Sequence, residues 1–290
     1  MAAVLFVDAN QYLNLYRMIA GKKLLATLQE QRGRIFVPRQ VVYEVERNKL
    51  RVAAEFLSDI LKNSVTKMNI PDHLFNIRED EMAELRRATD ETKATTERIE
   101  SLAIETLHRI SASLDDVSAR LKTIFNNAVE ETRDELERAT ERKLRGNPPG
   151  KNNDPLGDQI SWEQVLNACR KDAAMRLWVI TRDRDYGTRY ADKLFLNAFL
   201  RQEAAAACPA IELYCFDDLL KGLQHFAANA GVEAKQLPTE EEAKDIEKEI
   251  EALPQSNTMA PMTESELEIL GRYNRRLGIH YFGPVGNPPR

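Results

Sequence analysis

The sequence predicts an α/β protein: a parallel sheet flanked by helices, with a long, coiled-coil-like helical insert and a C-terminal extension. Residues 4–7 and 177–180 are apolar, partly β-branched runs with the length of buried parallel strands. Each run is closely followed by an aspartate, Asp8 after the first and Asp183 after the second. Helical patterns alternate with the strands, which favours a parallel sheet covered on both faces.

The first part of the chain predicts two strands, each followed by a helix. After the strand at 4–7, one helix is expected over about 11–30, with Gly33 ending it. The second strand covers residues 34–37. Pro38 suits the first turn of the next helix, because its missing N–H is not needed there. Pro71 marks the end of that helix.

A helical insert is expected at about 72–146. From 79 to 144 the chain is highly charged, contains no Gly or Pro and has high helix propensity. Apolar residues from Leu107 to Ala128 alternate three and four apart, which is a heptad seam. Ser113 followed by Asp115-Asp116 can start a helix, so the pattern fits either a helical hairpin or one long arm. The insert is either a solvated segment packed on itself or an arm for clamping nucleic acid or for dimerisation.

The second half returns to alternating strands and helices. A loop containing Pro148-Pro149-Gly150 precedes a helix that starts near Asp158. The strand at 177–180 is followed by an expected helix over about 190–206, a strand at 211–216 and a helix after Asp217-Asp218. Residues 1–232 form the predicted main domain. Residues 233–290 form an extension with an acidic helix or linker at 240–251, a Pro-containing linker and a short last helix from Thr263.

Composition excludes several classes of protein. The 290 residues carry a net charge of -5, so the chain as a whole is not a basic coat for nucleic acid. No apolar stretch reaches the length of a membrane span, and residue 8 breaks the only apolar run near the N-terminus. Three widely spaced cysteines favour reduced thiols and a cytoplasmic location. The four histidines show no paired spacing that would predict a zinc site.

Carboxylates stand at four element boundaries, at Asp8, Glu44, Asp158 and Asp183. In an open α/β sheet such boundaries converge beyond the carboxyl ends of the strands. Two carboxylates about 4 Å apart repel each other by roughly 4 kcal/mol at an effective dielectric constant near 20, so four together need a cation. Oxygen ligands without His or Cys favour Mg²⁺ or Mn²⁺. A phosphodiester is a substrate that suits such a site.

Each of these carboxylates also has a purely structural interpretation. Asp8 or Asn10 can cap the first helix, and Asp158 after Gly157 is an ordinary capping residue. Glu44 can lie on a helix surface. Asp183 and Asp185 can belong to a turn. The metal interpretation gains weight because all four boundaries suit one fold.

Four segments resemble the motifs of a known family, the PIN-domain nucleases. Residues 7–13, Val-Asp-Ala-Asn-Gln-Tyr-Leu, resemble its opening motif, and residues 37–45 resemble its second. Residues 157–163 after the Pro-Pro-Gly loop are similar to a bacterial PIN-like branch with a Gly-Asp and a tryptophan helix, long described as a domain of unknown function. Residues 181–186 resemble the final motif. The resemblance covers about residues 3–228, interrupted by the insert.

The resemblance implies a PIN-like fold and metal-dependent cleavage of RNA or DNA. In this chain the implied metal ligands are Asp8, Glu44, Asp158 and Asp183, with Asp185 as an auxiliary carboxylate. Asn10 and Thr181 are the implied polar groups that support the ligands. The cofactor would be Mg²⁺ or Mn²⁺.

Two groups of basic side chains can contact the phosphates of nucleic acid. One group precedes the Asp158 helix and the other lies near Asp183; alternatively, they balance charge on charged segments. The sequence shows no aromatic-rich platform for stacking bases, so no strong base preference is predicted. The candidates are Arg142, Lys143, Arg145, Lys151, Arg182 and Arg184.

Two other functions remain open from the sequence. A PIN-like module can be catalytically inactive and bind only nucleic acid or protein, because a fold does not guarantee its chemistry. A phosphatase for small molecules would use the same acidic edge, but it would need a Gly-rich phosphate loop that is not evident. The insert or the C-terminal tail can serve a protein partner or a second copy of the chain. A role in bacterial defence, as a toxin or in processing is not distinguished.

Overall fold

The computed structural model describes residues 2–64, 79–150, 156–172, 174–191 and 193–253. The described residues separate into two compact units, one formed by 2–52 and 114–253, the other by 53–113. The predicted insert is therefore divided between the two units. Pro71, Lys151 and the expected last helix from Thr263 lie outside the described residues.

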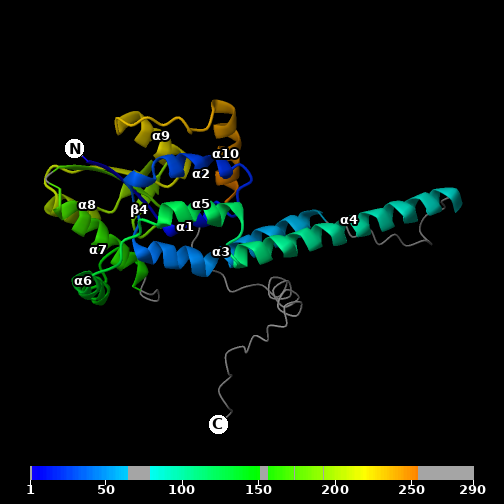
Figure 1. Ribbon diagram of the computed structural model, residues 1–290, viewed down its shortest axis with the longest axis horizontal. Coiled ribbons are helices and arrows are strands. Elements are labelled where there is room, and N and C mark those ends of the chain that lie inside the picture. Colours follow the sequence, from blue (N-terminus) through cyan, green and yellow to red (C-terminus); the bar gives the residue numbers. More distant parts are fainter. Residues whose placement is uncertain (1, 65–78, 151–155, 173, 192, 254–290) are drawn as a thin grey trace, which may run out of the picture. The chain divides into compact units, whose positions relative to one another are not determined.

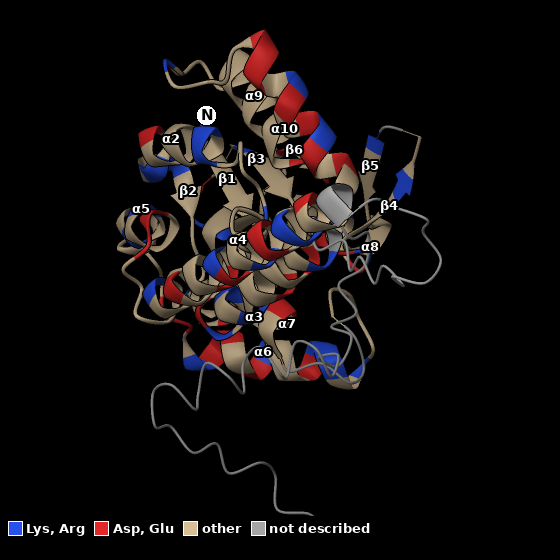
Figure 2. Ribbon diagram, turned by 90° about the vertical axis from the view of Figure 1, so that its right-hand side faces the viewer, with Lys and Arg blue, Asp and Glu red and all other residues tan. Residues whose placement is uncertain are grey.

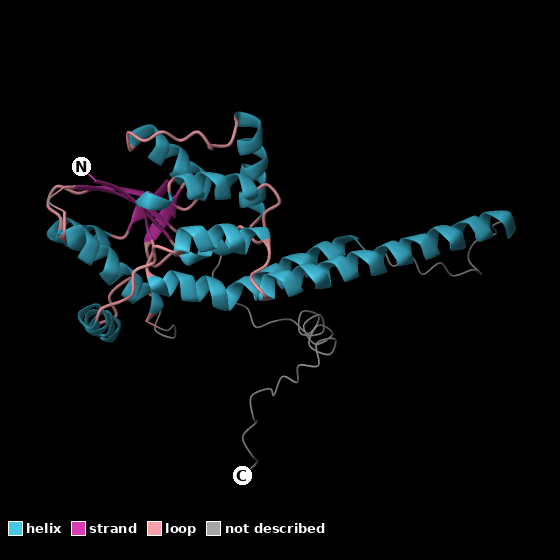
Figure 3. Ribbon diagram, in the orientation of Figure 1, coloured by secondary structure: helices cyan, strands magenta, loops and turns pink. Residues whose placement is uncertain are grey.

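The first unit is built on a four-stranded parallel sheet (Figure 3). The strand order is β2-β1-β3-β6, so the chain adds β2 on one side of β1 and then crosses to β3 on the other. Ligand sites of open α/β sheets lie where the order reverses in this way, here between β1 and β3. The α/β class with a parallel sheet is confirmed. The strands are β1 (Ala2–Val7), β2 (Ile35–Phe36), β3 (Met175–Ile180) and β6 (Glu212–Phe216).

The two central strands end level with each other. Their register runs from Ala2 opposite Met175 to Val7 opposite Ile180. The backbone N–H of Asp8 donates to the Ile180 carbonyl at 3.0 Å, which continues the pairing by one step. The residues that follow β1 and β3 therefore leave the sheet side by side.

Helices cover both faces of the sheet (Figure 1). On one face lie α2 (Lys22–Glu30), α9 (Leu219–Asn229) and α10 (Glu240–Ala252), and on the other lie α7 (Gly157–Arg170) and the first part of α3 (Arg39–Ser64). The core between these layers contains the fully buried Phe6, Trp162 and Trp178. The remaining helices are α1 (Ala9–Asn14), α4 (Glu79–Ser111), α5 (Asp116–Phe125), α6 (Arg133–Leu144) and α8 (Ala198–Ala207).

The single helix expected over 11–30 is wrong, because the chain forms α1 and α2 with a turn between them. At that turn a Cβ on Gly21 would lie 2.9 Å from the Cβ of Met18, so the backbone folds back closely there. Apolar residues of the turn, such as Leu15, are buried and continued the helical pattern in the sequence. The second strand is shorter than expected, because Arg32–Arg34 form a 3₁₀ turn.

The heptad seam does not form one continuous arm. Helix α4 ends at Ser111, Ser113 adopts a φ of 55°, and Asp115 caps α5 by accepting a bond from the Ser118 N–H at 2.9 Å. Helix α5 then packs into the first unit. Its Phe125 meets the Tyr12 ring edge-on at 5.1 Å, so this part of the predicted insert belongs to the core of the main fold.

The helix expected over 190–206 is also wrong in its first half. The chain forms an antiparallel hairpin, β4 (Gly187–Tyr190) and β5 (Lys193–Leu196), before α8 begins. The aromatic and β-branched residues of this segment favour strands. Asn197 caps α8, with its Oδ1 accepting from the Phe199 N–H at 2.9 Å.

The acidic segment after residue 239 is a helix, α10, rather than a linker. Thr239 and Glu242 form a capping box at its start. Ile246 is fully buried, and Glu249 accepts hydrogen bonds from the N–H groups of Ile19 and Ala20. The core therefore extends beyond the point where the apolar pattern fades. None of the helices in the described residues combines the length and apolar character of a membrane span.

Candidate active site

Asp8 follows β1 and is held by three donors. Its Oδ1 accepts from the Ala9 N–H at 2.7 Å, which caps α1 as the structural interpretation expected. Its Oδ2 accepts from the Thr181 hydroxyl at 2.6 Å and from the Asn10 amide. Burial raises the pKa of Asp8 to about 6 against these hydrogen bonds, and the nearby Asp183 adds to the rise. Asp8 is thus both a cap and a buried carboxylate facing the end of β3.

The segment after β3 brings Asp183 to the same place. Thr181 is fully buried, and its hydroxyl accepts from the Asp183 N–H at 3.0 Å while it donates to Asp8. The Asp183 Oδ1 accepts from the Asp185 N–H at 3.0 Å, a turn bond that keeps both carboxylates on one loop. Asn10 and Thr181, the two predicted supporting groups, both donate to the Asp8 carboxylate, and their roles at a metal site stay predictions.

Asp158 lies in the first turn of α7 and is not its capping residue, a position that Leu156 takes. Burial raises the pKa of Asp158 well above its ordinary value, and four other carboxylates add to the rise: Asp8, Glu44, Asp183 and Asp185. No hydrogen bond or ion pair to the Asp158 side chain occurs among the described residues. The four carboxylates predicted from the sequence, together with Asp185, therefore share one electrostatic environment.

Tyr186 is a further member of the site that the sequence reasoning missed. It is fully buried, and its hydroxyl lies 3.5 Å from the Asp158 carbonyl oxygen. Burial raises the pKa of Tyr186 well above its usual value, and Asp158, Asp8, Asp183 and Glu44 raise it further. The ring packs edge-on against Trp162 at 6.1 Å. The sequence signal that could have identified Tyr186 is its position at the end of the last motif, residues 181–186.

The carboxylates have the chemistry of a site for a hard cation, because all donors are oxygen and no basic side chain of the described residues pairs with Asp158. Within the described residues, however, no group of three or more Asp, Glu, His or Cys side chains is spaced so that it could already hold a metal ion. The carboxylates fit a Mg²⁺ or Mn²⁺ ion by their oxygen donors and by their location at the end of the sheet.

Comparison with known proteins decides the family. A family profile described as a PIN like domain matches residues 4–186, more than half of the chain. The chain belongs to the PIN-like domain family. No curated protein and no solved structure matches the chain. The PIN-like fold is a nuclease-type fold, and nucleases of this kind generally use divalent metal ions.

In this PIN-like protein Arg142 does not have the predicted role of a phosphate contact. The side chain is buried, with 4% of its surface exposed, and it forms ion pairs with Glu163 and Glu203. It also donates to the Pro148 carbonyl at 2.6 Å. Its guanidinium therefore joins α6, α7, α8 and the Pro-Pro-Gly loop. The assignment of Arg142 to nucleic-acid binding is wrong, because each guanidinium nitrogen already donates to a protein partner.

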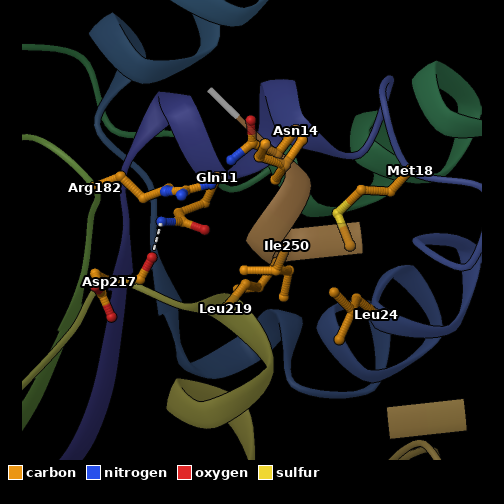
Figure 4. Close-up of a pocket in the computed structure, with 9 residues that line it drawn as sticks. Gln11, Asn14, Met18, Leu24, Arg182, Asp217, Leu219 and Ile250 are labelled. Carbon is orange, nitrogen blue, oxygen red and sulfur yellow. Dashed lines mark hydrogen bonds between the residues drawn. The ribbon is translucent and has the colours of Figure 1, made fainter. Parts of the chain in front are cut away.

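The other basic candidates differ in their availability. Lys143 is half-buried, and Arg145 is exposed but paired with Glu141 on its own helix. Arg182 lines a pocket together with Gln11 and Asp217 (Figure 4), and its Nη1 is buried without a hydrogen-bond partner in the described residues. Arg184 is exposed and makes no ion pair with the described part of the chain. Arg184 is thus available for a phosphate, beside Asp183 in the chain.

Gly150→Ala is expected to destabilise the loop that leads to Asp158. Gly150 has a φ of +109°, and a Cβ there would lie 2.0 Å from Nε2 of the buried Gln159, the residue after Asp158. The strained backbone alone costs roughly 1–3 kcal/mol, so thermal unfolding should occur several degrees lower. Gly146→Ala is the matched control: its φ is +69°, but nothing lies within 4 Å of the added Cβ. Equal losses would show that the contact with Gln159 does not matter.

Proposed function

We propose that this PIN-like protein is a metal-dependent nuclease that hydrolyses phosphodiester bonds of RNA or DNA. The observation that carries the proposal is Asp158, a carboxylate among four others with no cationic partner in the described residues. Such an arrangement costs stability, since buried charges are normally paired. Strongly perturbed carboxylates gathered at a sheet edge are a common mark of a functional site.

The proposed ligands are Asp8, Glu44, Asp158 and Asp183, with Asp185 nearby on the same loop as Asp183. A bound Mg²⁺ or Mn²⁺ supplies Lewis acidity for attack of water on a phosphodiester. Asn10 and Thr181 fix the orientation of Asp8 by donating to its Oδ2. Both contacts come from elements that the β1–β3 register places together, so the scaffold orients the acid before substrate arrives.

Metal removal is the direct test of the proposed function. Labelled single-stranded and duplex RNA and DNA are incubated with the full chain and Mn²⁺, with and without excess chelator. We expect cleavage that chelator abolishes, and a melting temperature that Mn²⁺ raises and chelator restores, because an ion bound only by the folded state stabilises it. Cleavage that persists in chelator contradicts the proposed chemistry. Binding of nucleic acid without cleavage indicates an inactive module, and turnover of small phosphate esters alone indicates a phosphatase.

A further inference from the structure

The hairpin β4–β5 borders a hollow beside the proposed active site. The hollow has a volume of about 470 Å³ and is lined by Asp183 of the carboxylate group and by Gly187, Thr188 and Leu194 of the hairpin. Arg182, Arg184, Arg189 and Asp217 complete its lining. A chain of phosphates lying in this hollow would pass Asp183 with cationic groups on its way. The hairpin is therefore placed to hold a nucleic acid next to the reaction.

The register of the hairpin separates two faces. Arg189 pairs with Leu194, and both line the hollow. Thr188 pairs with Phe195 and Tyr190 with Lys193, and side chains of paired antiparallel residues share a face. Thr188, Tyr190, Lys193 and Phe195 therefore share the face opposite Arg189, and of these four Thr188 also lines the hollow.

Two aromatic rings on this second face are strongly exposed. Tyr190 has 77% of its surface exposed and Phe195 has 55%. They are diagonal neighbours across the strand pair, about 7–8 Å apart, a step that successive nucleotides of an extended single strand can span. Exposed rings beside cations are the parts from which single-strand platforms are made, because every base offers a flat face for stacking.

The charges on and beside the hairpin favour a polyanion over an apolar protein surface. Lys193 lies on the face of the two rings, and Arg189 lies on the other. Figure 2 shows basic residues in blue on the β4–β5 hairpin. The side chains of Lys193 and Arg184 are exposed, and neither side chain makes an ion pair or hydrogen bond with the described residues. Arg189 has a partner, since it is 3.3 Å from Asp217.

We propose that the β4–β5 hairpin is a platform for single-stranded nucleic acid, with Tyr190 and Phe195 stacking on unpaired bases while Arg184 and Lys193 contact phosphates. The proposal deepens the proposed nuclease function and rests on it for the direction of the strand. The strand passes from the ring face of the hairpin to the hollow and Asp183 by way of Thr188, which lies on the ring face and also lines the hollow. The paired bases of a duplex do not offer their faces, so the platform selects single strands.

Binding is measured with the full chain carrying Asp158→Asn, so that cleavage cannot interfere. The probes are a labelled oligothymidylate, an oligouridylate and a DNA duplex, each about 15 units long to exceed one binding site. Tyr190→Ala with Phe195→Ala should weaken single-strand binding about 100-fold, since loss of one stacking residue typically costs about tenfold or more. Tyr190→Phe keeps the ring and should keep the affinity. Ile19→Ala, at a remote side chain with 78% exposure, is the control and should change nothing.

Salt dependence separates stacking from phosphate contact. Arg184→Gln should reduce the slope of log affinity against log salt by about 0.7, the value for one phosphate contact on a single strand. The double aromatic variant should leave that slope unchanged and should unfold at the parent temperature.

Several outcomes overturn the hairpin proposal. These are an affinity of the aromatic variant within twofold of the parent, equal binding of duplex and single strand, or self-association through the hairpin without binding of any probe. Cleavage by the chain with Asp158 intact that is unchanged by the two aromatic substitutions also overturns it, while the nuclease proposal stands. Hairpin-dependent binding by a chain that cleaves nothing overturns the nuclease proposal instead.

Discussion

Asp158→Asn is expected to abolish cleavage and, in the same protein, to raise the melting temperature in the absence of metal. Loss of one ligand of the proposed ion removes several kcal/mol of stabilisation from the transition state, which corresponds to a rate about 10³-fold lower. The stability gain follows from the raised pKa of Asp158. Its carboxylate form is disfavoured in the folded state by burial and by the four other carboxylates, so a neutral amide of the same shape removes that cost.

The sign of the stability effect follows from linkage. Because folding raises the pKa of Asp158, neutral pH disfavours the folded state at this group relative to the unfolded chain, which solvates the ionised carboxylate freely. Removing that cost should raise the melting temperature of the variant above that of the parent protein. Added Mn²⁺ should stabilise the parent protein but not the variant.

The matched control is Asp172→Asn, an exposed aspartate just after the same helix. Surface substitutions of this kind change stability by no more than about 0.5 kcal/mol, and cleavage should be retained. Differential scanning fluorimetry with and without Mn²⁺, beside a cleavage assay, gives both readouts. A variant of Asp158 that cleaves at the parent rate, or that loses both stability and activity like an ordinary core mutant, contradicts the proposed role.

The acidic edge could be predicted because its signals are local. Asp8 and Asp183 each follow a short apolar strand by one to three residues, and parallel strands place such positions at one edge. Asp158 was found from the loop and helix that surround it. These carboxylates affect one another electrostatically, as expected for side chains at one edge of the sheet. The strand register that brings them together is not contained in any of the local signals.

The errors occur where long-range packing or weak turn chemistry decides. In the sequence, the two residues between β4 and β5 are Ala-Asp, which lacks the Asn-Gly or Gly signal of a two-residue hairpin turn, so the sequence pattern predicts a helix there. The partners of Arg142, Glu163 and Glu203, are 21 and 61 residues away in sequence. From the sequence Arg142 looked like its exposed neighbours Lys143 and Arg145, because nothing nearby distinguishes a buried arginine from a solvated one.

Arg142→Met should be the most destabilising single change described for this protein. The arginine bonds Glu203 at 2.8 Å, Glu163 at 3.1 Å through Nε, and the Pro148 carbonyl. Removing one partner of a buried ion pair leaves an uncompensated charge and costs about 3–5 kcal/mol. Glu163, with 5% of its side chain exposed, cannot regain that loss from water. Unfolding by urea, monitored by circular dichroism, measures the change in the free energy of unfolding.

Two comparisons show whether the loss comes from the buried network. Arg145→Ala breaks an exposed pair with Glu141 on the same helix and should cost no more than about 0.5 kcal/mol. Adding Glu163→Gln to Arg142→Met removes one uncompensated charge and should recover part of the stability, which a simple loss of helix packing would not do. Since Arg142 also holds the Pro148 carbonyl, the single variant should weaken Mn²⁺ binding at Asp158 as well. Equal effects of the Arg142 and Arg145 variants would show that the network contributes nothing particular to the fold or to the site.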